Sequence, residues 1–163
     1  MSELISFLAN YISNPWIVVA ILGFLPITEV RVAILYGLIA GLDHSKLFLI
    51  AAGANILEVI VLFLIMGNKR ITKIIDRKIG KKIEHNIKKN RKNFEKYGEL
   101  ALVFLVASPV PGTGAIVGVF AAKALKLDKR WSFVTICASI LISAALVFLA
   151  AKFFMSLFGT VFI

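Results

Sequence analysis

The stretch GFLPITEVRVAILYG, residues 23–37, places a proline, a glutamate and an arginine inside an otherwise apolar run. Pro26 interrupts a helix that passes through it, because proline lacks the backbone N–H and clashes with the preceding turn. Glu29 and Arg31 are costly in hydrocarbon unless they face a cavity, a partner or each other. A second stretch, VASPVPGTGAIVG at residues 106–118, interrupts an apolar run with two prolines and a glycine-rich turn. We interpret these two interruptions as the working part of the molecule.

The composition of the chain is that of a membrane protein. Of its 163 residues, 60% are hydrophobic and 17% are charged, and the mean hydropathy is +0.91. A soluble domain of this length is about half apolar and carries about a quarter charged residues. Three apolar regions, residues 13–41, 46–66 and 131–163, are long enough to hold membrane segments. The sequence therefore predicts an all-α integral membrane protein, multi-pass in the plasma membrane.

Most of the charge lies in one block. The net charge is +10, and residues 68–99 contain twelve Lys or Arg and four acidic residues. Basic connecting segments stay on the cytoplasmic side of membranes, so we expect residues 68–99 and 125–130 in the cytoplasm and residues 41–46 outside. The isoleucine spacing in residues 67–98 predicts a basic amphipathic helix on an anionic membrane surface. Charge alone would also suit nucleic acid, but no binding motif accompanies it, so no nucleic-acid partner is expected.

Two segments have the length of a membrane-spanning helix. Residues 46–66 and 131–151 contain 21 residues each and would rise about 31 Å as helices. Residues 99–125 begin and end at segments expected in the cytoplasm, so this piece has to enter the membrane and return. We therefore predict a re-entrant hairpin there, with half-helices at 99–108 and 113–125.

The first interruption has two interpretations. Residues 16–25 and 28–41 would form a second re-entrant hairpin broken at Pro26. Residues 4–25 are also long enough to cross the membrane alone, so two full spans over residues 4–41 stay open as the alternative.

A shift of the chain by 85 residues aligns its two halves without gaps. The shift places Pro26 on Pro111, Thr28 on Thr113, Leu42-Asp43 on Leu127-Asp128, Phe48 on Phe133 and Phe63 on Phe148. Each half is a hairpin followed by one crossing, and the two crossings are expected to run in opposite directions, which indicates inverted repeats. The predicted domains are a first repeat at 1–66 (N-terminal helix, hairpin 16–41, helix 46–66), a basic helix at 67–98, and a second repeat at 99–163 (hairpin 99–125, helix 131–151, apolar tail).

Glu29 and Arg31 are the ionisable residues of the first interruption. Two positions apart on a helix, they point in different directions and do not pair locally, so each needs another partner or water. The pKa of a carboxyl group depends on its desolvation and on neighbouring charge, which makes Glu29 a candidate proton carrier. The planar fork of Arg31 suits an anionic headgroup. The alternative is a structural salt bridge between the repeats.

The remaining candidates are polar or helix-breaking residues. Thr28 and Thr113 would cap helix starts whose N–H groups attract anions, with plain capping as the alternative. Asn55 and Glu58 share one face of the first spanning helix, where function and structural hydrogen bonding are equally open. The full set of candidate substrate- or proton-binding residues is Pro26, Thr28, Glu29, Arg31, Asn55, Glu58, Pro109, Pro111, Gly112, Thr113 and Gly114. The sequence contains no catalytic triad, metal-ligand cluster or phosphate-binding glycine loop, so neither an enzyme nor a cofactor is expected.

The two tips, LPITEVRVAILYG and SPVPGTGAIVG, with a basic segment between them, resemble the putative small multi-drug export protein family and, more distantly, the DedA (VTT, or SNARE-associated) superfamily. The resemblance implies two opposed re-entrant hairpins and transport of lipid or amphipathic molecules, with an acid and arginines as key residues. Pro26, Thr28, Glu29 and Arg31 match the first tip. The residues matching the second tip are Pro109, Pro111, Gly112, Thr113 and Gly114. DedA members carry more arginines in the membrane region, where Arg31 of this chain stands nearly alone.

These observations predict a transporter, a proton-linked exporter or translocator of lipid-like or amphipathic molecules with its site between the two tips. The alternative is a membrane scaffold that recruits partners or anionic lipids through the basic helix at 67–98. The expected partners are membrane lipids, protons and an anionic lipid-like or amphipathic substrate, and a homodimer stays open.

Overall fold

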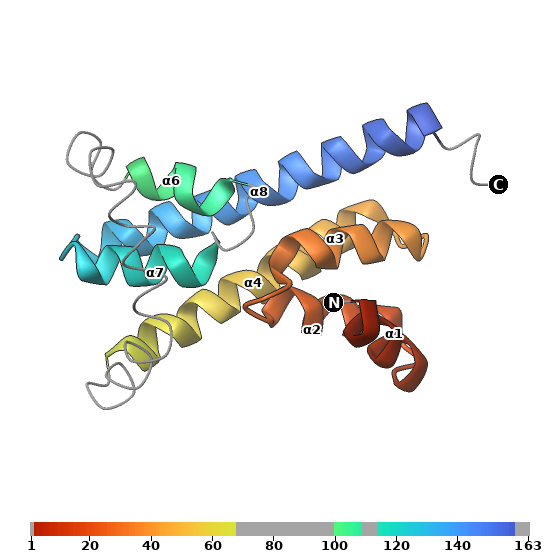
Figure 1. Cartoon of the computed structure of the whole chain (residues 1–163), viewed down its shortest axis with the longest axis horizontal. Helices are drawn as coiled ribbons and strands as arrows, with labels where there is room; N and C mark the ends of the chain where they lie inside the picture. Colours follow the sequence, from red (N-terminus) through yellow and green to blue (C-terminus); the bar gives the residue numbers. More distant parts are fainter. Residues whose placement is uncertain (1, 68–99, 109–113, 159–163) are drawn as a thin grey trace. The chain divides into compact units, whose positions relative to one another are not determined.

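The computed structural model describes residues 2–67, 100–108 and 114–158, and the regular elements in these ranges are all α-helices (Figure 1). This confirms the all-helical prediction. Most of the predicted basic helix at 67–98 lies outside the described residues. The helices are α1 (Ser2–Tyr11), α2 (Pro15–Phe24), α3 (Glu29–Ile39), α4 (His44–Met66), α6 (Leu100–Ala107), α7 (Ala115–Ala124) and α8 (Lys129–Phe158).

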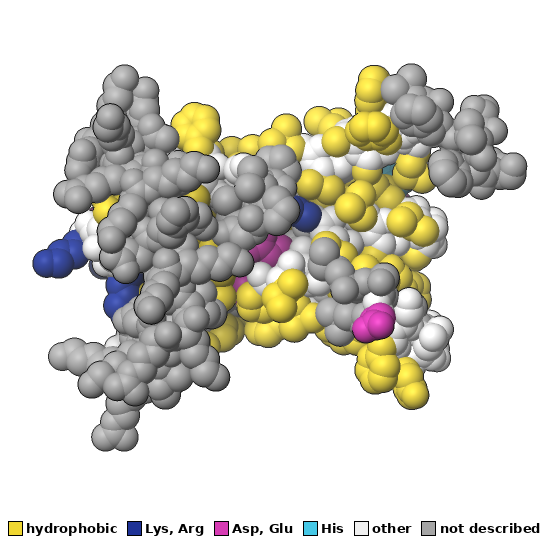
Figure 2. All heavy atoms as spheres, viewed as in Figure 1, with side chains coloured by type: hydrophobic (Ala, Val, Ile, Leu, Met, Phe, Trp, Pro, Cys, Tyr) yellow, Lys and Arg dark blue, Asp and Glu magenta, His cyan; other side chains and the backbone are white. Residues whose placement is uncertain are grey.

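Two of these helices, α4 and α8, are long and apolar enough to cross a membrane, over His44–Met66 and Lys129–Ser156. They contain the segments 46–66 and 131–151 that the sequence predicted. In the most apolar 18-residue stretch of each helix, 33% is buried inside the protein for α4 and 28% for α8. The core helix of a soluble protein, in contrast, buries its apolar face. Figure 2 shows hydrophobic side chains over most of the visible surface of the described residues. These helices are therefore candidates for contact with lipid.

The chain divides into two compact units. The first contains Met1–Asn55 and Leu141–Ile163, and the second contains Ile56–Ile140. Each unit holds one helical hairpin together with one part of α4 and one part of α8. In the first unit α2 packs on α3 and α1 contacts α2, and in the second unit α6 packs on α7.

The hairpin of the first unit is bounded by sequence signals. Asn14 begins α2 by accepting a hydrogen bond from the backbone N–H of Trp16 at 3.0 Å, and Pro15 occupies the first helical position, which proline favours. Because α1 ends at Tyr11, residues 4–25 do not form one continuous helix. α2 ends at Phe24, since Leu25 precedes Pro26 and takes extended backbone angles.

Close packing joins the hairpin of the first unit to α4. A Cβ atom added to Gly23 of α2 would lie 2.9 Å from the carbonyl oxygen of Ala51 and 3.1 Å from the Cβ of Ala54. In the second unit, a Cβ on Gly118 of α7 would collide with Val106 of α6. Glycine at these two positions lets the helices of each unit approach closely.

The connections after α3 and after α7 have the same backbone geometry, 85 positions apart. Gly41 and Lys126 both adopt left-handed angles, with φ of 67° and 53°. The N–H of Leu42 donates to the carbonyl of Gly37 at 3.0 Å, and the N–H of Leu127 donates to that of Ala122 at 2.9 Å. These bonds define a Schellman motif, which binds the carbonyls at a helix C-terminus.

An aspartate ends each connection and begins the next helix. Asp43 accepts a hydrogen bond from the N–H of Lys46 at 3.0 Å, and Asp128 accepts from the N–H groups of Arg130 and Trp131 at 2.9 Å. The side chains therefore cap α4 and α8. The Leu-Asp pairs that aligned in the sequence have equivalent structural roles.

The two connections differ in the residue that adopts the left-handed conformation. Gly41 does so without strain, whereas a non-glycine residue such as Lys126 pays roughly 1–2 kcal/mol. Lys126→Gly should therefore raise the thermal unfolding temperature in neutral detergent by about 2–4 °C for each kcal/mol recovered. Gly41→Ala should lower it by a similar amount, since a Cβ at Gly41 meets no atom within 4 Å and strain alone is added.

Lys126→Ala is the matched control for this comparison. It removes the same charge and side chain but keeps the Cβ atom, so it should leave the unfolding temperature near that of the unmodified chain. An equal rise in the alanine and glycine variants would show that relief of charge repulsion, and not backbone strain, stabilises the protein.

Candidate functional site

The candidate site lies at the tip of the first hairpin, where α2 ends and α3 begins. Such a tip leaves free carbonyl groups at the end of α2 and free N–H groups at the start of α3, and these need hydrogen-bond partners when water is excluded. The partners come from Thr28 in the tip and from Asn55 in α4. These two residues belong to the first unit.

Thr28 is buried, and its hydroxyl binds carbonyl groups at the end of α2. The hydroxyl donates to the carbonyl oxygen of Leu22 at 2.5 Å and approaches that of Leu25 at 3.3 Å. Thr28 stands at the N-cap position of α3, as predicted, but it makes no side-chain capping bond and its backbone angles are those of the right-handed helix. The prediction that its side chain caps α3 is therefore wrong. The reason is that the nearby carbonyls of α2 compete for the hydroxyl.

Asn55, and not Thr28, provides a side-chain hydrogen bond at the start of α3. Its side-chain oxygen accepts a hydrogen bond from the backbone N–H of Val30 at 3.3 Å, and Asn55 itself is almost completely buried. A neutral amide oxygen thus occupies a position on α3 where the sequence predicted that an anion would bind. The sequence identified Asn55 as a candidate but not this contact.

Glu29 is the first residue of α3 and is only 6% exposed. Its φ of 52° lies in the left-handed region, which is strained for a residue with a side chain. The N-terminus of a helix favours a negative charge by about 0.3–1 kcal/mol, which offsets part of the cost of burying a carboxylate. The structure therefore holds an acid in a strained conformation at a broken helix.

Arg31 is half-buried, two residues further along α3, and contacts α8. Its Nε donates to the hydroxyl of Ser143 at 3.2 Å. This contact agrees with the expectation that Arg31 finds its partner outside its own helix. Ser143 is a site residue that the sequence reasoning missed. Its only signal was its alignment with Glu58 under the shift of 85 residues.

The remaining candidates lie in three places. Pro26 is an exposed residue of the tip, and Glu58 is buried in the second unit. Gly114 directly precedes α7 with a φ of 121°, and this position, not Thr113, is the N-cap of α7. The other predicted residues of the second tip, Pro109, Pro111, Gly112 and Thr113, lie outside the described residues.

The first hairpin tip carries two ionisable side chains, the carboxyl group of Glu29 and the guanidinium of Arg31. Glu29 can bind and release a proton, and the guanidinium of Arg31 can bind an anionic oxygen. Among the described residues no group of three or more His, Cys, Asp or Glu could hold a metal ion. Asn55 and Ser143 tie the tip to α4 and α8, the two candidate membrane-spanning helices.

Comparison with protein families matches residues 29–146 to the family described as "Putative small multi-drug export protein". The match begins at Glu29 and includes Arg31, Asn55 and Ser143. Comparison with curated proteins and with solved structures gave no match. Because the matched region covers well over half of the chain, this protein belongs to the small multi-drug export protein family.

Proposed function

We propose that this chain is a proton-linked membrane transporter that exports lipid-like or amphipathic molecules, with Glu29 and Arg31 as its proton- and anion-binding residues. The observation that carries the proposal is the buried, left-handed Glu29 at the tip of a broken hairpin. The family description supports export as the general function. The resemblance of the tips to DedA proteins favours lipid-like substrates.

The energetics of Glu29 support a functional role. Thr28 and Asn55 already bind backbone groups of the tip. Burying a carboxylate beside them adds a desolvation cost, and its left-handed backbone adds roughly 1–2 kcal/mol. Strain of this kind is concentrated at functional sites, where the surrounding structure maintains it. A residue that only stabilised the tip would not require either cost.

The contact of Arg31 supports an anionic substrate group. The bond from Nε to Ser143 fixes the plane of the guanidinium, and a planar fork binds carboxylate or phosphate with two parallel hydrogen bonds. Amphipathic anions combine such a headgroup with an apolar body that suits the exposed hydrophobic surface of the helices. Protonation of Glu29 would then change the net charge of the hairpin tip.

The proposal includes a membrane arrangement. The hairpin helices α2, α3, α6 and α7 have between 8 and 11 residues and rise roughly 12–17 Å, about half of the hydrocarbon thickness. They are too short to cross, which supports two re-entrant hairpins in inverted repeats. The basic segment at 68–99 is then cytoplasmic, by the positive-inside rule.

Replacing Glu29 with Gln keeps the size of the side chain but removes its titration. Glu29→Gln should abolish the pH dependence of transport while the protein remains folded. The measurement is movement of a short-chain, fluorescently labelled phosphatidylglycerol across liposomes under an imposed pH gradient, together with thermal unfolding in detergent. Glu3→Gln is the matched control, because Glu3 is an exposed glutamate of the same unit, and it should leave the pH dependence unchanged.

A structural role for Glu29 gives a different pair of results. Removing one partner of a buried ion pair typically costs about 3–5 kcal/mol of stability. If Glu29→Gln is strongly destabilised and the protein that remains folded transports with normal pH dependence, Glu29 has a structural role only. The scaffold function would then become the better explanation.

Arg31→Lys preserves the charge but removes the planar fork. It should raise the concentration of labelled phosphatidylglycerol that gives half-maximal transport by about tenfold, since charge-assisted hydrogen bonds contribute about 1.5–3 kcal/mol. Ser143→Ala should have a smaller effect in the same direction, because it loosens the guanidinium without removing it. If the unmodified protein, Arg31→Lys and Ser143→Ala all have the same half-maximal concentration, Arg31 does not bind the substrate.

Membrane sidedness is tested by labelling single cysteines in a Cys137→Ser background, since Cys137 is the single native cysteine. We expect both termini and the Asp43 connection outside, and Gly80 and the Asp128 connection inside. Cysteines at Lys46 and Arg130 report on the two connections and leave the capping aspartates intact. Labelling of positions 80 and 130 from opposite faces would contradict the re-entrant hairpin at 99–125.

A further inference from the structure

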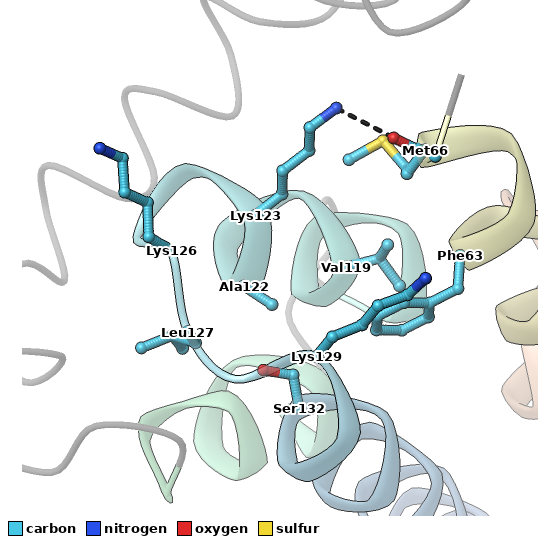
Figure 3. Close-up of a pocket in the computed structure, with 10 residues that line it drawn as sticks. Phe63, Met66, Val119, Ala122, Lys123, Lys126, Leu127, Lys129 and Ser132 are labelled. Atoms are coloured by element: carbon cyan, nitrogen blue, oxygen red, sulfur yellow. Dashed lines mark hydrogen bonds between the residues drawn. The ribbon is translucent and has the colours of Figure 1, made fainter. Parts of the chain in front are cut away.

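A cavity of about 280 Å³ lies within the second unit, and all of the residues that line it belong to that unit. Its walls come from the end of α4, from the second half of α7 and from the first turn of α8. Apolar side chains form one part of the lining, including Phe63, Val119 and Leu127. Three lysines, Lys123, Lys126 and Lys129, also line the cavity. Figure 3 shows the Lys123 side chain directed toward Met66 and the Lys126 side chain extending outward, away from the other labelled residues. We call this cavity the lysine pocket.

The lysine pocket is electrostatically positive. Its three lysines are exposed at the surface, and Arg130 adds a fourth basic residue beside it. Lys123 donates to the carbonyl oxygen of Met66 at 3.2 Å (Figure 3), which places a positive charge at the C-terminus of α4, where the helix dipole favours it. Asp128 is the acid of this segment, and its carboxylate binds backbone N–H groups at the start of α8.

Ser132 supplies a buried polar group in the same lining. Its side-chain oxygen is buried and has no hydrogen-bond partner among the described residues. A buried hydroxyl without a partner is costly, and it indicates a missing ligand or water. Because Ser132 lines the pocket, an oxygen-rich ligand there could accept the hydrogen bond that the hydroxyl lacks.

The fold itself does not require these lysines. The connection after α3 has the same Schellman geometry and the same aspartate cap, yet it has Leu38, Gly41 and His44 at the positions equivalent to the three lysines. At Lys126 the lysine even adds backbone strain that Gly41 avoids. The positive lining is thus an addition to a connection that folds without it.

The position of the pocket identifies the kind of ligand. It lies where the candidate membrane-spanning helix α4 ends and α8 begins. Trp131, next to Ser132, is 66% exposed, and exposed tryptophans at helix ends mark the membrane–water interface. Basic pockets at this level between membrane helices suit phosphate headgroups. An adjoining apolar wall suits the first carbons of an acyl chain.

We propose that the lysine pocket binds the phosphate of an anionic membrane phospholipid, with Lys126, Lys129 and Ser132 contacting the headgroup and Phe63 and Leu127 contacting the upper acyl chain. The volume of about 280 Å³ is near the lower end of the range for ligand sites, so it holds a headgroup and not a whole lipid. Glu29 and Arg31 do not line this pocket, and the proposal does not depend on the proposed export function.

Trp131 provides a local reporter of lipid binding. The chain has two tryptophans, so Trp16→Phe leaves Trp131 as the single fluorophore. The full-length protein is reconstituted in bilayers that mix phosphatidylcholine with phosphatidylglycerol, and bromine atoms on the upper acyl chain of either lipid quench the fluorescence. We expect phosphatidylglycerol to be preferred over phosphatidylcholine at Trp131. Lys126→Gln with Lys129→Gln should reduce this preference by about fivefold for each lysine.

The matched control removes two exposed lysines of the first unit, Lys46→Gln with Lys152→Gln, and should keep the preference. Ser132→Ala gives a second readout, because it should raise the unfolding temperature in lipid-free detergent and lower the phosphatidylglycerol preference. Equal loss in both double variants, or no preference in the unmodified protein, would refute the site. If inorganic phosphate at millimolar concentration abolishes the preference, the pocket binds a free anion and the lipid assignment is wrong.

Discussion

The structure of the first unit depends on two side-chain hydrogen bonds to backbone groups on either side of the break between α2 and α3. The hydroxyl of Thr28 binds a carbonyl at the end of α2, and the amide of Asn55 binds an N–H at the start of α3. In an apolar medium each unsatisfied backbone group costs several kcal/mol, so an interruption without such partners is not tolerated. With these bonds made, the chain holds a buried glutamate and a half-buried arginine at the start of α3.

Local signals in the sequence predicted the helices well, because each helix end depends on residues next to it. Pro26 ends α2 through the restriction on Leu25, and the aspartates at 43 and 128 begin the two long helices. These effects act over one to four residues and can be recognised without knowing the fold. The match of the two Leu-Asp pairs under the shift of 85 residues was visible for the same reason, since these pairs have local roles.

The partners at the tip could not be predicted in this way. Ser143 contacts Arg31 across 112 positions, and Asn55 contacts Val30 across 25. The hydroxyl of Thr28 had two possible uses, and only the approach of the Leu22 carbonyl decided between them. Such choices depend on the packing of separate helices. A sequence identifies the polar residues that need partners, but the fold determines which partners they find.

The short connection between α3 and α4 has a mechanical consequence. The N–H groups of residues 40–42 all donate to carbonyls of α3, and the side chain of Asp43 binds the N–H of Lys46 in α4. Gly23 of α2 also leaves no room for a Cβ atom against the backbone of α4. This joint therefore has little torsional freedom, and the first hairpin behaves as a rigid extension of the N-terminal part of α4. Any rotation of the hairpin must turn that part of α4 with it, because no loop is present to absorb the movement.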